Sequence, residues 1–210
     1  DKAKIEKMLI LKGAGSNGKS VVFETLKGLL GEENVKTIPL SGLINNGTER
    51  KQNIASINGK RLNYCSEIQT KEFGQNVDAL KALISGEPVE VRLLYVNNFT
   101  ARNIPLLMAN ANRMPYIKDW SHGLSRRIII LPFDVVLEER EQNKQLSSEL
   151  RKEYPGILNW ILAGRQRLIA NNYQFSVSQA LADTVEDYQS ESSTVLAFMK
   201  AQDYHRTLLE

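Results

Sequence analysis

Short apolar runs alternate with helical patterns over the first two thirds of the chain. Residues 8–11 form an apolar run with the length of a buried parallel strand. Apolar positions then recur at helical spacing through residues 21–30, and Gly31 follows them as a helix stop. Further apolar runs at residues 62–65 and 127–133 predict additional strands. This alternation predicts an α/β fold with a mostly parallel sheet.

A hairpin is predicted ahead of one more core strand. Residues 77–84 have the pattern of a helix, and residues 89–94 alternate as a half-buried strand does. Asn97 and Asn98 follow as a turn, and residues 104–109 form the next apolar run. The chain between the helix and this run is therefore expected to fold back on itself before it enters the core.

The last third of the chain has a helical pattern. Residues 142–171 are charged and helical, with Pro155 suited to a first helical turn. A second amphipathic helix is predicted from Ser178, interrupted by the polar residues 189–194. One apolar stripe is expected on the first of these helices, and its members are Ile157, Trp160, Ile161, Gly164 and Leu168.

Residues 34–60 are polar and glycine-punctuated, and the only element that they predict is a turn at Asn58 and Gly59. The whole pattern indicates an α/β core over residues 1–137 and a helical portion over residues 138–210.

Composition and charge set broad bounds on the class of protein. The 210 residues are 42% hydrophobic and 24% charged, as in ordinary globular domains, and the net charge of +3 does not by itself indicate a nucleic-acid partner. Cys65 is the only cysteine, which excludes an intrachain disulfide and favours a reducing compartment. The sequence has no apolar run of membrane-spanning length and no secretory leader. It begins at Asp1 without Met, so we expect a piece of a longer protein.

The strongest chemical signal is a run that fits the phosphate-binding pattern G-x-x-x-x-G-K-[ST]. Glycines in this pattern let backbone N–H groups surround nucleotide phosphates, while Lys19 reaches the β- and γ-phosphates and the Ser20 hydroxyl binds Mg²⁺. The predicted strand precedes the run and the predicted helix follows it, as this chemistry requires. The sequence therefore predicts binding of ATP and Mg²⁺ by Gly13, Ala14, Gly15, Ser16, Asn17, Gly18, Lys19 and Ser20.

Two strand ends offer candidates for activating water. Glu67 follows the strand at residues 62–65, where an NTPase places an acid beside the γ-phosphate. Many such sites have two successive acids, but Ser66 stands at the first position here. Mg²⁺ is therefore expected to rely on Ser20 and water, with Glu67 acting on the metal through water. Asn110 and Asn112 end the next strand, and an amide there can orient water, although turn residues are an alternative reading.

Basic residues at two places are candidates for other roles. Arg126 or Arg127 can act as an arginine finger on a neighbouring subunit, or the pair can simply be solvated. Lys81, Arg92 and Arg102 surround the predicted hairpin and suit a nucleic-acid backbone, but each alone is more often a surface charge.

The order of these motifs resembles that of the superfamily 3 helicase domain, most closely in the primase–helicase proteins of phages, plasmids and large DNA viruses. The segment PGILNWILAG is also similar to the part that follows the core in this family. The likeness covers residues 8–164. It rests on the strings GAGSNGKS, RLNYCSE, LKALISGEPVEVRLLY, LLMANANRMPYIKD and SRRIIILPF.

This resemblance implies an AAA+-type α/β/α sandwich of the P-loop NTPase class, with C-terminal helices. Glu67 would be the catalytic carboxylate. Asn112, rather than Asn110, aligns with the water-sensing asparagine, because Asn112 precedes Pro115 by three residues. Arg126 or Arg127 would act in trans, with Arg126 slightly favoured. The residues aligned with the triphosphate and Mg²⁺ site are Gly13, Gly18, Lys19 and Ser20.

The family also implies a function and partners. Its members are ATP-dependent DNA helicases that usually assemble as hexameric rings on single-stranded DNA, often with an attached primase. A bacterial host cytoplasm would be the location. Relatives often carry a lysine at the hairpin tip, where this chain has asparagines. The expected DNA contacts are therefore Lys81, Arg92, Asn97, Asn98 and Arg102.

Two alternatives remain open at this stage. A monomeric P-loop kinase would share the phosphate loop but need a substrate lid and be indifferent to DNA. A nucleotide-gated initiator or scaffold with slow hydrolysis would share every residue named above, so only rate and strand displacement separate it from a helicase.

Overall fold

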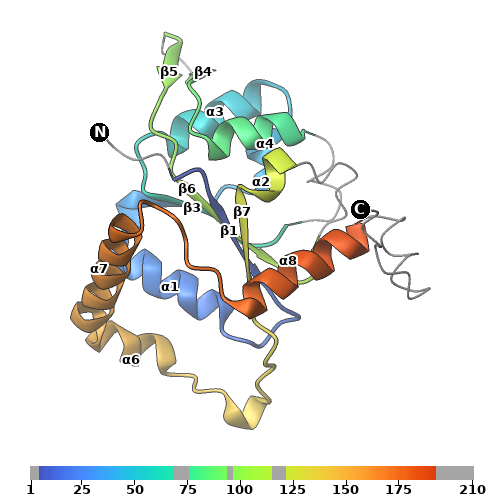
Figure 1. The fold of residues 1–210 in the computed structure, drawn as a ribbon. Coiled ribbons are helices and arrows are strands. Elements are labelled where there is room, and N and C mark those ends of the chain that lie inside the picture. Colours follow the sequence, from blue (N-terminus) through green and yellow to red (C-terminus); the bar gives the residue numbers. More distant parts are fainter. Residues whose placement is uncertain (1–4, 69–75, 94–96, 115–121, 193–210) are drawn as a thin grey trace, which may run out of the picture.

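Five parallel strands form the central sheet of the computed structural model in Figure 1, which describes residues 5–68, 76–93, 97–114 and 122–192. The strand order is β2-β3-β6-β1-β7. Neighbouring strands run in the same direction at every pairing in this sheet. The bounds are β1 Met8–Lys12, β2 Val35–Lys36, β3 Leu62–Cys65, β6 Leu106–Ala111 and β7 Ile128–Pro132. The predicted α/β fold with a mostly parallel sheet is confirmed.

Helices cover both faces of the sheet (Figure 1). Successive side chains of β1 explain this, because strand residues point to opposite faces in turn. Met8 and Ile10 pack into one apolar cluster with α2 (Leu40–Ile44), α3 (Thr48–Ile57) and α4 (Val77–Ile84). Leu11 packs into a second cluster with Phe23 of α1 (Lys19–Leu30). The sheet therefore has an apolar core on each side.

The structure contains helices that the sequence did not predict, within the polar stretch at residues 34–60. After the short η1 helix (Glu32–Asn34) and β2, this stretch folds into α2 and α3. α2 buries three of its five residues, whereas α3 buries only a narrow side that holds Ile54, Ala55 and Ile57. A narrow apolar face anchors a helix such as α3 even when most of its residues are polar, so composition alone did not predict it.

The predicted hairpin is confirmed. β4 (Val89–Val91) pairs antiparallel with β5 (Phe99–Ala101), and Figure 1 shows the pair projecting from one end of the molecule. Val91 of β4 and Ala101 of β5 are buried, so the paired strands pack against the body of the molecule. The following core strand begins at Leu106, two residues later than the apolar run indicates.

One short helix, α5 (His122–Ser125), precedes β7. The chain after β7 is helical, as expected, and its elements are η2 (Glu139–Glu141), α6 (Leu146–Lys152), α7 (Tyr154–Ala170) and α8 (Gln179–Ser192).

Two details of the prediction for these helices were wrong. Trp160 does not belong to the apolar stripe of α7, because it is 73% exposed. The expected interruption at residues 189–194 is absent up to Ser192, since polar residues weaken a helix only slightly. Residues 193–210 lie outside the described residues.

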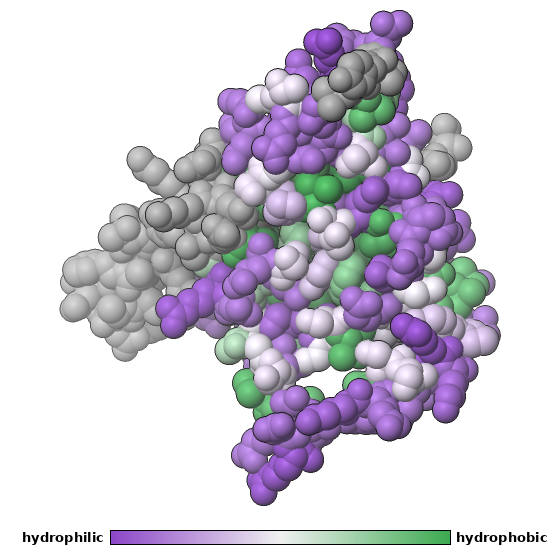
Figure 2. Space-filling model, turned by 180° about the vertical axis from the view of Figure 1, so that it is seen from behind, coloured by the Kyte–Doolittle hydropathy of each residue, from purple (hydrophilic) through white to green (hydrophobic). Residues whose placement is uncertain are grey.

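The last described helix returns to the sheet. α8 lies against β7, and Tyr188 is buried in the larger apolar cluster. Figure 2 shows the opposite side of the molecule, where hydrophobic residues reach the surface in the middle of a largely hydrophilic face. Within the described part of the chain, the length and hydropathy needed to cross a bilayer are found in none of the helices.

Candidate active site

The loop between β1 and α1 has three residues in left-handed backbone conformations. Gly15 and Gly18 have φ angles of 111° and 86°, and Ser16 between them has a φ of 47°. Such left-handed conformations suit glycine and turn the peptide N–H groups of a loop inward. The Leu137 N–H donates to the Ser16 carbonyl at 2.9 Å, so the segment after β7 holds the outer side of the loop.

Gly13 lies where the loop passes closest to β7. A Cβ at this position would lie 2.3 Å from the Phe133 carbonyl oxygen and 2.2 Å from Asn17 Nδ2. The same Nδ2 donates to the Phe133 carbonyl at 2.8 Å. The first glycine of the loop is therefore required by close packing, and Asn17 ties the loop to the end of β7.

Lys19 is folded back across the loop. Its Nζ donates to the Gly13 carbonyl at 2.6 Å and to Asn17 Oδ1 at 2.9 Å, and the residue is only 5% exposed. Burial lowers the pKa of Lys19, and the charge of Glu67 opposes this effect. A buried ammonium group with two neutral acceptors is prepared to receive an anion.

A cavity of about 420 Å³ opens beside this loop, at the edge where the carboxyl ends of β1, β3 and β6 meet. Gly13 lies in the packed base of the loop, and Ala14 is exposed outside the lining. Six of the eight residues predicted for the nucleotide line the cavity, namely Gly15, Ser16, Asn17, Gly18, Lys19 and Ser20. The other side chains around it are Val21, Ser66, Glu67, Asn110, Asn112, Leu137, Gln142, Asn143 and Leu146.

The structure brings Glu67 and Asn112 together. Asn112 Nδ2 donates to Glu67 Oε1 at 2.9 Å, although the two residues follow different strands. The strands β3 and β6 are neighbours, and the Ile68 N–H also donates to the Asn110 carbonyl at 2.9 Å. The carboxylate and the amide predicted to act on water thus face the same cavity as Lys19. Pro115, which completes the motif, lies outside the described residues.

Asn110 is the buried amide of this site. It is 7% exposed, and its Nδ2 donates to the Tyr64 hydroxyl. Its Oδ1 has no hydrogen-bond partner among the described residues. The Tyr64 ring stacks on Phe23 with 3.7 Å between ring centroids, and burial raises the pKa of its phenol. This support fixes the amide at the cavity, where a ligand donor can satisfy the free oxygen.

Sequence reasoning missed several residues of the site. In the sequence, Tyr64 and Phe23 are recognisable only as members of apolar segments. Their ring stacking, which supports Asn110, has no sequence pattern. Gln142 and Asn143 line the cavity from an irregular segment, and no motif marks them. These two residues reach the cavity only because the chain after β7 folds back toward the loop between β1 and α1.

The two arginines before β7 differ sharply. Arg127 is held inside the molecule, where Nε donates to Ser85 Oγ at 2.9 Å, Nη1 donates to the Gly123 carbonyl at 2.6 Å and Nη2 pairs with Glu6 at 3.1 Å. Arg126 is exposed, and its carbonyl accepts a hydrogen bond from Lys7. Both stand at the amino end of β7, at the opposite edge of the sheet from the cavity of their own chain.

The predicted DNA contacts lie away from the cavity. Arg92 and Arg102 are exposed at the two ends of the hairpin, and Asn97 and Asn98 are exposed within it. Lys81 is half-buried on α4 and pairs with Asp78 at 3.4 Å. The hairpin itself thus carries four of the five residues.

Three solved apo structures of the C-terminal region of NrS-1 resemble this chain. The first has a TM-score of 0.60 and 16% identity, and the match covers 94% of this chain and 45% of that one. The other two have TM-scores of 0.51 and 0.52 at 19% and 18% identity, covering 72% and 73% of this chain and 34% and 36% of those. The chain therefore spans less than half the length of these structures, and the likeness shows a shared fold.

A family assignment comes from the sequence match. Residues 11–127, which extend from the end of β1 to Arg127 and include the phosphate-type loop, Glu67 and both asparagines, match the family of unknown function DUF5906. This match covers more than half of the 210 residues. The protein whose loop, carboxylate and amides meet at one sheet edge belongs to the DUF5906 family.

Proposed function

We propose that this chain is a P-loop ATPase domain of the AAA+ type and works as the motor of a superfamily 3 DNA helicase. The observation that carries the proposal is the convergence of Lys19, Ser20, Glu67 and Asn112 on one cavity at the carboxyl edge of a parallel sheet. That edge is where open α/β sheets bind ligands. The glycine-rich turn before α1 adds backbone donors for phosphates.

The residues present fit ATP and Mg²⁺. Lys19 supplies a buried positive charge for the β- and γ-phosphates, and the exposed Ser20 hydroxyl can bind the metal at the start of α1. The free Oδ1 of Asn110 suits a donor such as metal-bound or attacking water. When bound, Mg²⁺ would neutralise charge on the phosphate oxygens.

Hydrolysis would proceed by in-line attack of water on the γ-phosphorus, which breaks the bond to the bridging oxygen and releases ADP and phosphate. Glu67 accepts a hydrogen bond from the water and withdraws its proton as the new bond forms. Asn112 orients the same water, and its existing bond to Glu67 keeps the two groups in one position. Lys19 stabilises the charge on the phosphoryl oxygens.

The arginine finger is assigned to Arg126. Arg127 already uses its guanidinium group within its own chain, whereas Arg126 is exposed. Because Arg126 stands at the opposite edge of the sheet from its own cavity, it can serve only the cavity of a neighbour. This agrees with a ring in which ATP is bound between subunits, hexameric in the whole protein.

Single-stranded DNA is the proposed track. The hairpin of β4 and β5 projects from the body (Figure 1). Exposed Arg92, Asn97 and Asn98 lie on its tip side, between the two strands, and exposed Arg102 lies at its base. Such a combination suits the DNA backbone. The wider proposal is replication of a phage, plasmid or integrated element, with a primase attached or associated.

The slow-hydrolysing initiator or scaffold is the second candidate function. It is favoured by the compact Glu67–Asn112 contact, which could hold the carboxylate in a resting position. The monomeric kinase has less support, because the hairpin and the exposed Arg126 have no role in it.

A Lys19→Ala variant tests the nucleotide site. We expect ATP hydrolysis to fall at least about 100-fold, because a major charge on the phosphates is lost. Lys27→Ala is the matched control, since Lys27 lies on the same helix and pairs only with the exposed Glu32 at 3.0 Å. Hydrolysis and nucleotide binding are measured separately, each with and without single-stranded DNA.

The outcomes separate the candidates. A Lys19→Ala rate close to that of the unmutated protein would remove the nucleotide-site assignment. ATP binding with little hydrolysis in the unmutated protein, unchanged by DNA, would favour the scaffold.

A further inference from the structure

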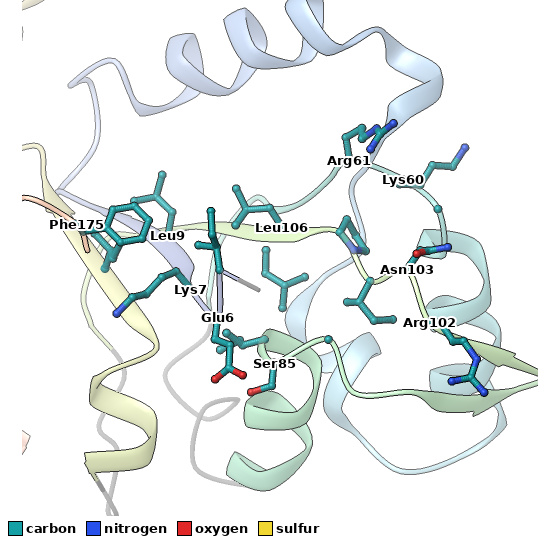
Figure 3. Close-up of a pocket in the computed structure, with 18 of the residues that line it drawn as sticks. Glu6, Lys7, Leu9, Lys60, Arg61, Ser85, Arg102, Asn103, Leu106 and Phe175 are labelled. Carbon is teal, nitrogen blue, oxygen red and sulfur yellow. The ribbon is translucent and has the colours of Figure 1, made fainter. Parts of the chain in front are cut away.

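A second and larger cavity lies at the opposite edge of the sheet. Its volume is about 870 Å³, and it is formed at the amino ends of β1, β3 and β6 (Figure 3). Its floor is apolar, with Leu9, Leu106 and Ile129 from three strands and Phe175 from the segment after α7. Leu106 is 45% exposed, although it belongs to a central strand. We call this cavity the basic groove.

Cationic side chains lie at both ends of the basic groove. Figure 3 shows Lys60, Arg61 and Arg102 at one end and Lys7 beside Phe175 at the other. Arg61 and Arg102 have no acidic partner among the described residues. Glu6 is the only acid in the lining, and Arg127 already pairs with it. An occupant that is both acidic and apolar would complement this groove.

The chain itself contains such a segment at residues 134–141, which we call the acidic segment. It follows β7 and holds the consecutive apolar residues Val135, Val136 and Leu137, which are 72%, 56% and 38% exposed. Exposed apolar residues that are contiguous are candidates for an interaction surface. Asp134, Glu138, Glu139 and Glu141 flank them, with Arg140 as the only cation. In Figure 1 this stretch leaves the sheet and runs out to η2 at the far end of the molecule.

We propose that the basic groove of one copy of this chain receives the acidic segment of a second copy. The groove and the segment lie at opposite edges of the sheet, so one molecule cannot join its own two surfaces. The contact is therefore head-to-tail, and such a contact builds a ring when its rotation closes and an open filament when it does not.

This contact would complete the active site. The acidic segment adjoins the cavity of its own chain, because the Leu137 N–H donates to the Ser16 carbonyl and Leu137 lines the cavity. The basic groove adjoins Arg126, whose carbonyl accepts from the groove residue Lys7. Docking thus brings Arg126 of one copy to the nucleotide cavity of the next. Only this last step rests on the proposed function, since charge and exposure alone support the contact.

A protein segment fits the groove better than single-stranded DNA does. Bases bind such grooves by stacking on aromatic side chains, and Phe175 is the only aromatic residue in the lining. The rest of the floor is aliphatic, as suits the side chains of valine and leucine.

Paired charge reversals test the contact. The groove variant is Lys60→Glu with Arg61→Glu, and the segment variant is Asp134→Lys with Glu139→Lys. Arg61, Asp134 and Glu139 are exposed, and Glu139 makes an exposed ion pair with Lys144 at 3.5 Å. Lys60 is half-buried, and its Nζ donates to the Glu33 carbonyl at 2.7 Å. Arg165→Glu on α7 is the control, because Arg165 is exposed and belongs to neither surface. Self-association is followed by analytical ultracentrifugation, and folding by thermal unfolding.

Each variant alone should weaken self-association at least about tenfold, because like charges then face each other. An equimolar mixture of the two should recover association, since both junctions of an alternating assembly again pair opposite charges. The control should associate as the unmutated protein does.

Three results would overturn the proposal. One is an unmutated chain that stays monomeric at every concentration at which it remains dissolved, with and without ATP. Another is two weakened variants that fail to recover on mixing. The third is a groove variant that associates as strongly as the unmutated protein. If this variant also binds a labelled oligothymidine more weakly than the unmutated protein does, the groove holds DNA instead. Lys19→Ala leaves these charges intact, so loss of hydrolysis and loss of association are read separately.

Discussion

At the scale of single residues, the site depends on Gly13 as much as on the charged groups. The distances from a Cβ at this position to Asn17 and to the Phe133 carbonyl leave no room for a methyl group. One of these neighbours is backbone at the end of β7, so it cannot move aside without displacing the strand. The glycine therefore sets how closely the loop lies against the sheet.

Gly13→Ala should destabilise the protein by about 1–3 kcal/mol, because the loop and the end of β7 must separate. Nucleotide affinity should fall as well, since Asn17 also holds the Lys19 ammonium group. Denaturant unfolding and nucleotide titration measure the two effects.

Gly164→Ala is the contrasting change, because the nearest atom to its added Cβ is 3.9 Å away within α7. It should stabilise the protein by about 0.5–1 kcal/mol. A Gly13→Ala variant as stable as the unmutated protein would contradict the steric argument.

The sequence was sufficient for the parts of the site that follow strand ends. Glu67 and Asn112 follow consecutive apolar runs, and the ends of parallel strands meet at one edge, so their proximity could be expected. The stacking of Tyr64 on Phe23 and the three contacts of Arg127 could not be predicted. They depend on packing between segments that are distant in the chain, for which the sequence has no periodic signal.

At the scale of elements, the amino end of β7 separates two neighbouring arginines into different roles. Arg127 joins Ser85 after α4, Gly123 of α5 and Glu6 before β1, so it connects three segments. Arg126 lies beside it in the turn that precedes β7, and its side chain is exposed. The pair also shows why periodicity alone left the choice between them open.

Arg127→Ala should lower the free energy of unfolding by about 1–3 kcal/mol, because buried Ser85 loses its donor and Glu6 its cation. Arg126→Ala should change stability by less than about 0.5 kcal/mol. It should reduce ATP hydrolysis while ATP binding remains. The two variants are compared by chemical unfolding, nucleotide titration and hydrolysis assays. A stable Arg127→Ala variant that binds ATP but no longer hydrolyses it would reverse the assignment.

The sequence predicted the strands and helices that have long apolar runs. It did not predict the short elements or the helix with a narrow apolar face. The five-strand sheet lacked only β2, which is two residues long, and the hairpin followed from its alternation. α3 was missed because most of its residues are polar, and α2 was missed because it has only five residues. Trp160 was misplaced because its position fits the helical spacing although its side chain is exposed.

At the scale of the whole molecule, the parallel sheet separates two complementary surfaces. Because every strand of this sheet runs the same way, the loops at one edge form the cavity beside Lys19 and those at the other form the basic groove. A molecule with different chemistry at its two ends is suited to head-to-tail assembly.

Hydrolysis per chain should therefore rise with protein concentration and rise again with single-stranded DNA. In the proposed assembly each cavity lacks the arginine of a neighbour at low concentration, so we expect a low basal rate. Mixing Lys19→Ala chains with Arg126→Ala chains should produce more activity than either alone, because some junctions then join an intact cavity to an intact finger. Steady-state assays over a dilution series measure both effects. A rate per chain that is flat across the series would indicate that each molecule works alone.

The resting position of Lys19 has a consequence for which ligands can enter. Its ammonium group donates to the Gly13 carbonyl and the Asn17 side chain, which leaves one of its three N–H donors without a partner among the described residues. A charged phosphate oxygen that reaches this donor gains a charge-assisted hydrogen bond, whereas a neutral sugar or a nucleoside gains much less. We therefore expect the loop to select ligands by whether their phosphate chain is long enough to reach the lysine, before any contact with the base.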